Sequence, residues 1–129
     1  MRVLADTFAG GQAERKIEAV LKCRERPTAV IALWESAAGL VIRVARRMGI
    51  RMGRDLEVVA WKARERNVDS LTSEALDGYR PAVVVWRMRQ MAKLAIARLD
   101  LRRTAPDIPV SVTKIPVRLE LAKDQGQEG

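Results

Sequence analysis

The sequence predicts an α/β fold, a three-layer sandwich built on a mainly parallel sheet. Residues 28–33 (TAVIAL) and 56–61 (LEVVAW) are short apolar runs, and residues 35–48 between them carry apolar side chains at helical spacing. Short runs of β-branched and apolar residues are typical of strands buried on both faces, which occur mainly in parallel sheets. Strand, helix and strand in this order form a βαβ unit, for which a right-handed crossover is expected.

The helix of this unit is predicted to begin at Glu35 and to end before Gly49. Its apolar residues recur on one side, and three arginines fall on the other: Leu40, Val41, Val44, Ala45 and Met48 against Arg43, Arg46 and Arg47. This pattern is typical of an amphipathic helix. Gly49 follows the last turn, where a positive φ is favoured, and the arginines suit the negative end of the helix dipole.

The remaining elements are expected in an order that continues the α/β pattern. We expect a helix at 12–23, a polar surface loop at 63–79 with one helical turn at 70–76, a third buried strand at 82–85, a helix at 87–101, and edge strands or a loose hairpin at 108–121. Residues 1–8 are predicted to be an edge strand or a lead-in, and residues 122–129 a polar tail. One domain over residues 1–121 is therefore the expected organisation.

Composition excludes several classes of protein. No apolar run among the 129 residues approaches the length of a membrane span, and residues 1–10 lack the apolar centre of a signal peptide, so a cytoplasmic location is expected. The single cysteine, Cys23, excludes an intrachain disulfide and is expected to be an ordinary residue. Because the chain has no histidine, we expect no zinc site, and we expect no cofactor.

The net charge of +8 raises the alternative of a stand-alone basic protein that binds nucleic acid. The basic residues, however, are spread along several elements, aromatic residues make up only 4% of the chain, and no helix-turn-helix or zinc-finger spacing is present. The charge is therefore interpreted mainly as solvated helix faces, with nucleic-acid binding kept as the alternative.

Candidate ligand-binding residues follow from the expected parallel sheet. Ligands of such sheets gather at the carboxyl ends of the strands. Trp34 and Glu35 follow the first strand, and Lys62 follows the second. We therefore expect Trp34, Glu35 and Lys62 to lie at a common edge of the sheet.

Five short motifs occur in an order that points to a family. They are RPTAV through Trp34-Glu35 at 26–35, GIR through DLEVVAWK at 49–62, a strand at 81–84, MAKLA at 91–95 and VRLE at 117–120. Together they resemble the effector-binding region of LacI-type transcription regulators, over residues 5–121. The family segments are RPTA(V/I)(F/L)xAND, GL(R/V)VPxD(V/I)SVVG(F/Y)DD, PLTTV, MGRRA and LVVRES. The resemblance implies one lobe of a periplasmic-binding-protein-like sensor that binds a sugar or a sugar derivative.

The departures from these motifs carry a hypothesis about the ligand. The family's paired Asn and Asp become Trp34 and Glu35, and an Asp that commonly binds effector hydroxyls becomes Lys62. An ammonium in place of a carboxylate suits an anionic effector, a sugar acid or a sugar phosphate, whereas a solvent-exposed Lys62 is the equal alternative. The resemblance also places Phe8 where an effector-stacking aromatic is found, while Trp61 is expected to be a core or interface residue.

The resemblance also sets expectations about partners. A helix-turn-helix headpiece and a first lobe are not present in this chain, so operator DNA is expected to be contacted only through such a headpiece. Apolar surface exposed where the first lobe would lie predicts a homodimer. No membrane partner is expected.

Other functional classes fit less well. An enzyme is not expected, because no phosphate-binding glycine motif, nucleophile elbow or histidine is present. A solute-binding protein for transport shares the expected fold, but the absence of a signal peptide argues against export.

Overall fold

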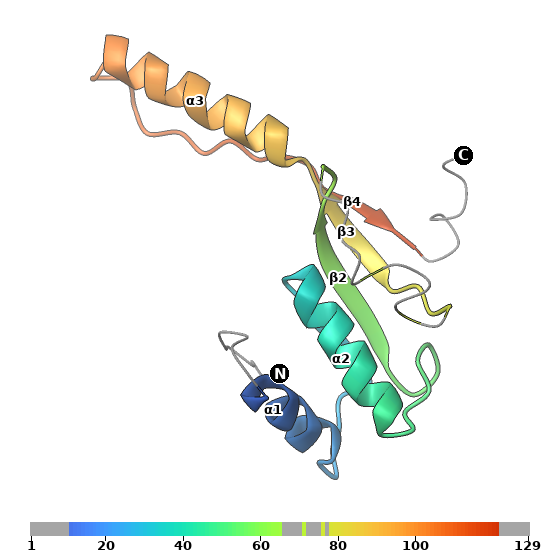
Figure 1. Cartoon of the computed structure of the whole chain (residues 1–129). Helices are drawn as coiled ribbons and strands as arrows, with labels where there is room; N and C mark the ends of the chain where they lie inside the picture. Colours follow the sequence, from blue (N-terminus) through green and yellow to red (C-terminus); the bar gives the residue numbers. More distant parts are fainter. Residues whose placement is uncertain (1–10, 66–70, 72–75, 77, 122–129) are drawn as a thin grey trace.

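The computed structural model describes residues 11–65, 71, 76 and 78–121 of the chain. Within this part the chain forms three helices and four strands (Figure 1). In chain order they are α1 (Gln12–Leu21), β1 (Ala29–Ala32), α2 (Glu35–Arg47), β2 (Glu57–Ala63), β3 (Ala82–Trp86), α3 (Met88–Thr104) and β4 (Arg118–Glu120). None of the helices among these residues is both long and apolar enough to cross a membrane.

The four strands form one sheet in the order β1-β2-β3-β4. The first three strands are parallel, with Ala32 opposite Ala60 and Trp61 opposite Val84, and β4 pairs antiparallel with β3 at the edge. The expected α/β class with a mainly parallel sheet is therefore confirmed, and so is the strand–helix–strand unit formed by β1, α2 and β2.

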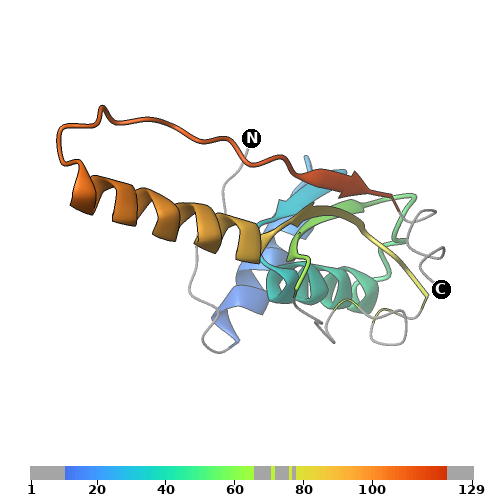
Figure 2. The ribbon, with the colours of Figure 1, turned by 90° about the horizontal axis from the view of Figure 1, so that it is seen from above.

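Helices α1 and α2 cover one face of the sheet, as the view from above shows (Figure 2). Buried side chains of α2 and of the strands form the core between these layers, and the largest fully buried ones include Ile42, Val44, Leu56 and Val58. On the outer side, the Arg47 guanidinium contacts the carboxylates of Glu14, at 2.9 Å, and Glu18, at 2.7 Å, and so joins α1 to α2.

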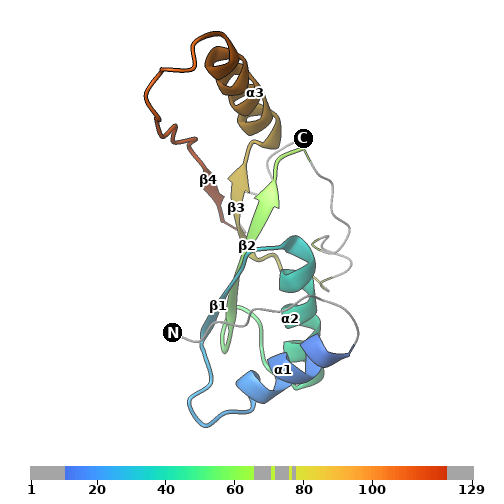
Figure 3. The ribbon, with the colours of Figure 1, turned by 90° about the vertical axis from the view of Figure 1, so that its left-hand side faces the viewer.

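The opposite face of the sheet is open in the described part of the chain. Ile31 of β1 is 72% exposed and Leu119 of β4 is 57% exposed. The prediction that the strand at residues 28–33 is buried on both faces is therefore wrong. The third layer of the expected sandwich would cover this face, but α1 and α2 both lie on the other side, and α3 does not pack over the sheet (Figure 3).

The end of α2 is formed as the sequence predicts. Gly49 has φ +74°, and its N–H donates to the Arg46 carbonyl at 2.8 Å. The next residue, Ile50, donates its N–H to the Ala45 carbonyl at 3.0 Å. These two bonds satisfy carbonyls of the last turn in a Schellman arrangement, which requires the left-handed backbone that glycine adopts without strain.

Helix α3 projects away from the sheet, and residues 105–117 run back beside it to β4 (Figure 1). The Arg98 guanidinium links the two, donating to the Pro109 carbonyl at 3.2 Å and to the Ser111 hydroxyl. No residue of α3 is buried. The helix and the segment that returns along it form an arm, residues 88–117, whose apolar side chains face solvent.

Several boundaries differ from the predictions. The first helix ends at Leu21 rather than 23, β2 continues to Ala63, and α3 continues to Thr104. Only β4 forms a strand within residues 108–121, as an edge strand. Residues 1–8, the tail 122–129 and most of the predicted helical turn at 70–76 lie outside the described residues.

Candidate functional site

The carboxyl ends of β1, β2 and β3 meet at one edge of the sheet, because the three strands are parallel neighbours. The pairing of β2 with β3 continues to this edge, where Lys62 lies opposite Val85 and Ala63 opposite Trp86. The Arg64 N–H then donates to the Trp86 carbonyl at 2.8 Å and extends the ladder by one bond. The two strands therefore end level with each other.

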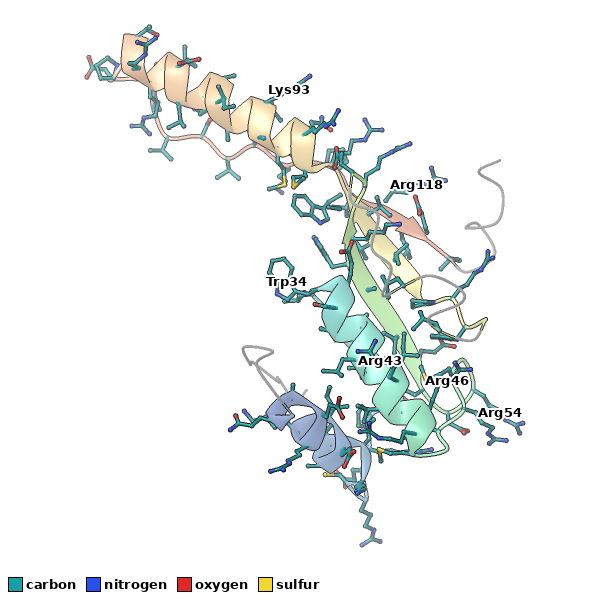
Figure 4. The ribbon with its side chains drawn as sticks, viewed as in Figure 1. Trp34, Arg43, Arg46, Arg54, Lys93 and Arg118 are labelled. Carbon is teal, nitrogen blue, oxygen red and sulfur yellow. The ribbon has the colours of Figure 1, made fainter. Side chains whose placement is uncertain are left out.

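Trp34 lies at this edge, between β1 and α2. It is the N-cap residue of α2, with an extended backbone, and its carbonyl accepts a hydrogen bond from the Ala38 N–H at 3.0 Å. Its side chain is 63% exposed and points away from β2 at the first turn of the helix (Figure 4). An exposed indole at the carboxyl end of a strand offers a flat apolar face to a ligand.

Glu35 and Lys62 share the same edge but differ in exposure. Glu35 begins α2 and is only 8% exposed, in the first turn, where a carboxylate is stabilised by the helix dipole. Lys62 is partly exposed, and alternation along β2 places it on the side of the sheet that carries Val58 and Ala60. Burial of Glu35 favours a supporting role for its carboxylate, whereas Lys62 is accessible from solvent.

The two other aromatic candidates have different outcomes. Phe8 lies outside the described residues. Trp61 lies opposite Val84, and its large apolar side chain is 36% exposed. By alternation it belongs to the open face with Val59 rather than to the core side with Ala60.

Beyond the strand ends, Arg64, Glu65, Arg87 and Arg89 line an open cavity of about 570 Å³. Arg64 and Glu65 follow β2 directly, Arg87 is the N-cap residue of α3, and Arg89 lies in its first turn. None of these four residues was among the predicted site residues. Arg64 and Arg87 directly follow β2 and β3, so the rule that selected Lys62 would have found them had the ends of these strands been predicted at Ala63 and Trp86.

Glu65 fixes the start of α3 against the end of β2. Its carboxylate accepts hydrogen bonds from the backbone N–H of Met88, at 3.0 Å, and of Arg89, at 3.3 Å. Desolvation raises the pKa of the Glu65 carboxyl, but the backbone N–H groups of Glu65, Arg89 and Met88 and the charge of Arg89 outweigh it, so that the pKa lies below its ordinary value. The carboxylate is therefore ionised and held by the helix N-terminus.

Comparison with known proteins identifies the fold and the family. Residues 1–121 match the family model of the periplasmic binding protein-like domain. A structure assigned as a transcriptional regulator LacI from Bacillus cereus subsp. cytotoxis NVH 391-98 is similar with a TM-score of 0.65 and 18% identity, covering 83% of this chain and 36% of that one. A structure from Mycobacterium smegmatis is similar with a TM-score of 0.55 and 21% identity, covering 93% of this chain and 37% of that one.

The chain thus spans little more than a third of the length of these two solved structures. No curated protein sequence matches it. The match to the family model covers almost all of the chain, and the parallel sheet with its carboxyl edge agrees with it. The chain belongs to the periplasmic binding protein-like domain family.

Proposed function

We propose that this chain is the effector-binding lobe of a LacI-type transcriptional regulator and that it binds a sugar or a sugar derivative without chemical catalysis. The observation that carries the proposal is the family match over residues 1–121. The similarity to a structure assigned as a LacI regulator supports it. In such a protein the ligand would bias one of two lobe arrangements, and DNA affinity would change elsewhere in the intact regulator.

The ligand would contact the carboxyl edge of the sheet. There the exposed ring of Trp34 would pack on an apolar face of the ligand, and the partly exposed Lys62 would donate to an anionic group. Glu35, which is buried, would orient the first turn of α2. This assignment favours a sugar acid or a sugar phosphate over a neutral sugar, because Lys62 brings a positive charge to the site.

The site can be tested by thermal unfolding of the chain with neutral sugars, sugar acids and sugar phosphates. A bound ligand is expected to stabilise the fold by about 2.7 kcal/mol at about 100 times its Kd. Trp34→Ala is expected to abolish this shift, whereas Leu119→Ala, which removes an exposed side chain from another strand, should leave it unchanged. Stabilisation by neutral sugars alone would contradict the anionic ligand, and no stabilisation by any of the three classes would contradict the proposed function.

Assembly and location belong to the same proposal. We place the protein in the cytoplasm, where a regulator meets its operator, and the operator would be contacted through a headpiece outside this chain. The apolar side chains exposed on the arm, residues 88–117, and on the open face of the sheet favour a homodimer that covers them.

Direct nucleic-acid binding by this chain is less favoured. The basic residues labelled in Figure 4 come from separate elements spread along the molecule and do not form one compact cluster: Arg43 and Arg46 from α2, Arg54 from a turn, Lys93 from α3 and Arg118 from β4. Other arginines are used within the fold, since Arg47 contacts Glu14 and Glu18 and Arg51 contacts Asp55 at 2.7 Å.

A gel shift with nonspecific DNA over a range of salt concentrations separates the two functions. Steeply salt-dependent binding by the chain alone would favour the nucleic-acid alternative.

A further inference from the structure

We propose that Arg64, Arg87 and Arg89 form an anion-binding subsite that holds the carboxylate or phosphate of a small-molecule ligand. This inference rests on the proposed function and names the ligand chemistry of the site. The three residues come from two elements that the parallel pairing brings together: Arg64 follows β2, and Arg87 and Arg89 lie at the start of α3, directly after β3. They line one shallow, open cavity of about 570 Å³.

The lining of this cavity carries a net positive charge. Its lining holds three arginines and one glutamate, Glu65. The Glu65 carboxylate already accepts hydrogen bonds from the N–H groups of Met88 and Arg89. None of the three guanidinium groups donates a hydrogen bond to another residue in the described part of the chain. Three guanidinium groups around one shallow cavity therefore create a positive potential that attracts an anion.

The residue type narrows the class of anion. A guanidinium presents its N–H donors in a planar fork that matches the two oxygens of a carboxylate or a phosphate. Because Glu65 occupies the first N–H groups of α3, side chains rather than the helix N-terminus would hold the ligand. The partly exposed Lys62 lies two residues before Arg64 on β2, at the same edge, and adds to the positive potential. A small ligand with one terminal anionic group and a polar body fits this arrangement.

The test is isothermal titration of the full chain with four probes: glucose 6-phosphate, gluconate, glucose and inorganic phosphate. The first two carry an anionic group on a sugar body, so preference for one of them distinguishes a phosphate from a carboxylate subsite. Arg64→Gln and Arg87→Gln are expected to weaken binding of the preferred anion by roughly tenfold or more each, as loss of a charge-assisted hydrogen bond predicts. Arg87→Lys should also lose much of the affinity, because it keeps the positive charge but removes the planar fork of N–H donors.

Arg54→Gln is the matched control. It removes the same charge from an exposed arginine in the turn before β2, outside the cavity. An equal loss of affinity in Arg54→Gln and Arg64→Gln would overturn the proposal, because net charge alone would then explain binding. Circular dichroism checks folding, and Arg64→Gln tests the subsite without altering the N-cap of α3.

The outcomes separate this inference from the proposed function. Binding of glucose as tightly as of its charged derivatives, unchanged in all three variants of Arg64 and Arg87, would leave the effector-binding role in place and overturn the anion subsite. Binding of anions that is lost in those variants and kept in Arg54→Gln supports both. Failure of all four probes to bind the wild-type chain overturns the anion subsite, and the wider ligand panel then decides the proposed function.

Discussion

The carboxylate of Glu65 lies 3.0 Å from the backbone N of Met88 and joins the end of β2 to the first turn of α3. A second bond from the Arg89 N–H to the same carboxylate makes Glu65 the cap of a helix whose N-cap residue, Arg87, has no side-chain cap of its own. Helix N-termini leave backbone donors without partners, and a carboxylate satisfies them and complements the helix dipole. The direction in which the arm leaves the sheet therefore depends on Glu65.

Replacement of Glu65 is expected to loosen the first turn of α3. In Glu65→Ala the N–H groups of Met88 and Arg89 lose their acceptor, so their amide hydrogen exchange should accelerate relative to the wild type. Glu65→Gln keeps one acceptor oxygen without the charge, so its exchange rates should lie between those of the wild type and those of Glu65→Ala. Exchange that is unchanged in Glu65→Ala would show that the cap is not needed.

The same contact predicts a dependence on pH. Because the pKa of Glu65 is lowered in the folded state, its stabilising contribution is present above the ordinary value of 4.5 and is lost as the pH falls through the lower folded value. The stability difference between wild type and Glu65→Gln should therefore shrink in acid. Chemical denaturation at neutral and acidic pH measures this difference, and a constant difference would contradict it.

Tyr79 is expected to stabilise the start of β2 through its hydroxyl. That oxygen accepts a hydrogen bond from the Val58 N–H and donates to a Glu57 carboxylate oxygen, both at 3.2 Å. In Tyr79→Phe the Val58 N–H loses this acceptor, and unfolding free energy should fall by about 1 kcal/mol. Urea denaturation at neutral pH checks the value. Tyr79 has no role in the proposed ligand site, so ligand affinity in this variant should match the wild type.

Alkaline conditions test the same residue. Desolvation raises the pKa of Tyr79, and the negative charge of Glu57 adds to the increase, against the lowering effect of the Val58 N–H. The neutral phenol thus stabilises the fold below the ordinary value of 10.0, and this contribution is lost as the pH rises through the higher folded value. Tyr79→Phe should lack this alkaline loss, and an identical loss in both proteins would assign it to other groups.

Two isoleucines should respond differently to truncation because they lie on opposite sides of the sheet. Ile42 of α2 is fully buried between helix and sheet, whereas Ile31 of β1 is 72% exposed on the open face. Ile42→Ala leaves a cavity and should reduce stability by roughly 2–5 kcal/mol. Ile31→Ala should change the stability of the monomer by less than about 0.5 kcal/mol. Similar losses in dilute solution would mean that the open face is covered.

Structural features that depend only on residues close together in the sequence could be predicted from it. The end of α2 at Gly49 is one case, since the need for a positive φ after the last turn is a local property. The extension of β2 to Ala63 is different, because it depends on pairing with Trp86 of β3, which is distant in the sequence. The exposure of Ile31 depends on which elements cover the sheet, and an apolar run alone does not contain that information.

The candidate site shows the same difference between local features and features that depend on distant residues. Trp34 and Lys62 could be placed at the carboxyl edge from the strand ends alone, and the structure places them there. The cluster of Arg64, Arg87 and Arg89 was missed, because the ends of β2 and β3 were predicted too early and only the parallel register of the two strands shows that the three residues share one cavity. A charge pattern along the sequence does not reveal such a convergence.

The arm, residues 88–117, is expected to mediate self-association of the chain. Ile96 and Leu99 of α3 are 60% and 69% exposed and lie three residues apart, on one side of the helix. Burial of such side chains against a second copy would contribute about 1.5–3 kcal/mol each. Sedimentation of the wild type is therefore expected to give a mass that rises with concentration towards that of a dimer.

Ile96→Glu combined with Leu99→Glu should shift this equilibrium to the monomer, because charged side chains would have to be desolvated in the interface. Lys93→Gln is the control, since it changes the charge of α3 at a side chain that points into solvent (Figure 4). It should leave the wild-type equilibrium unchanged. A wild type that stays monomeric at high concentration, or a double variant that associates as strongly as the wild type, would exclude the arm as the dimer interface.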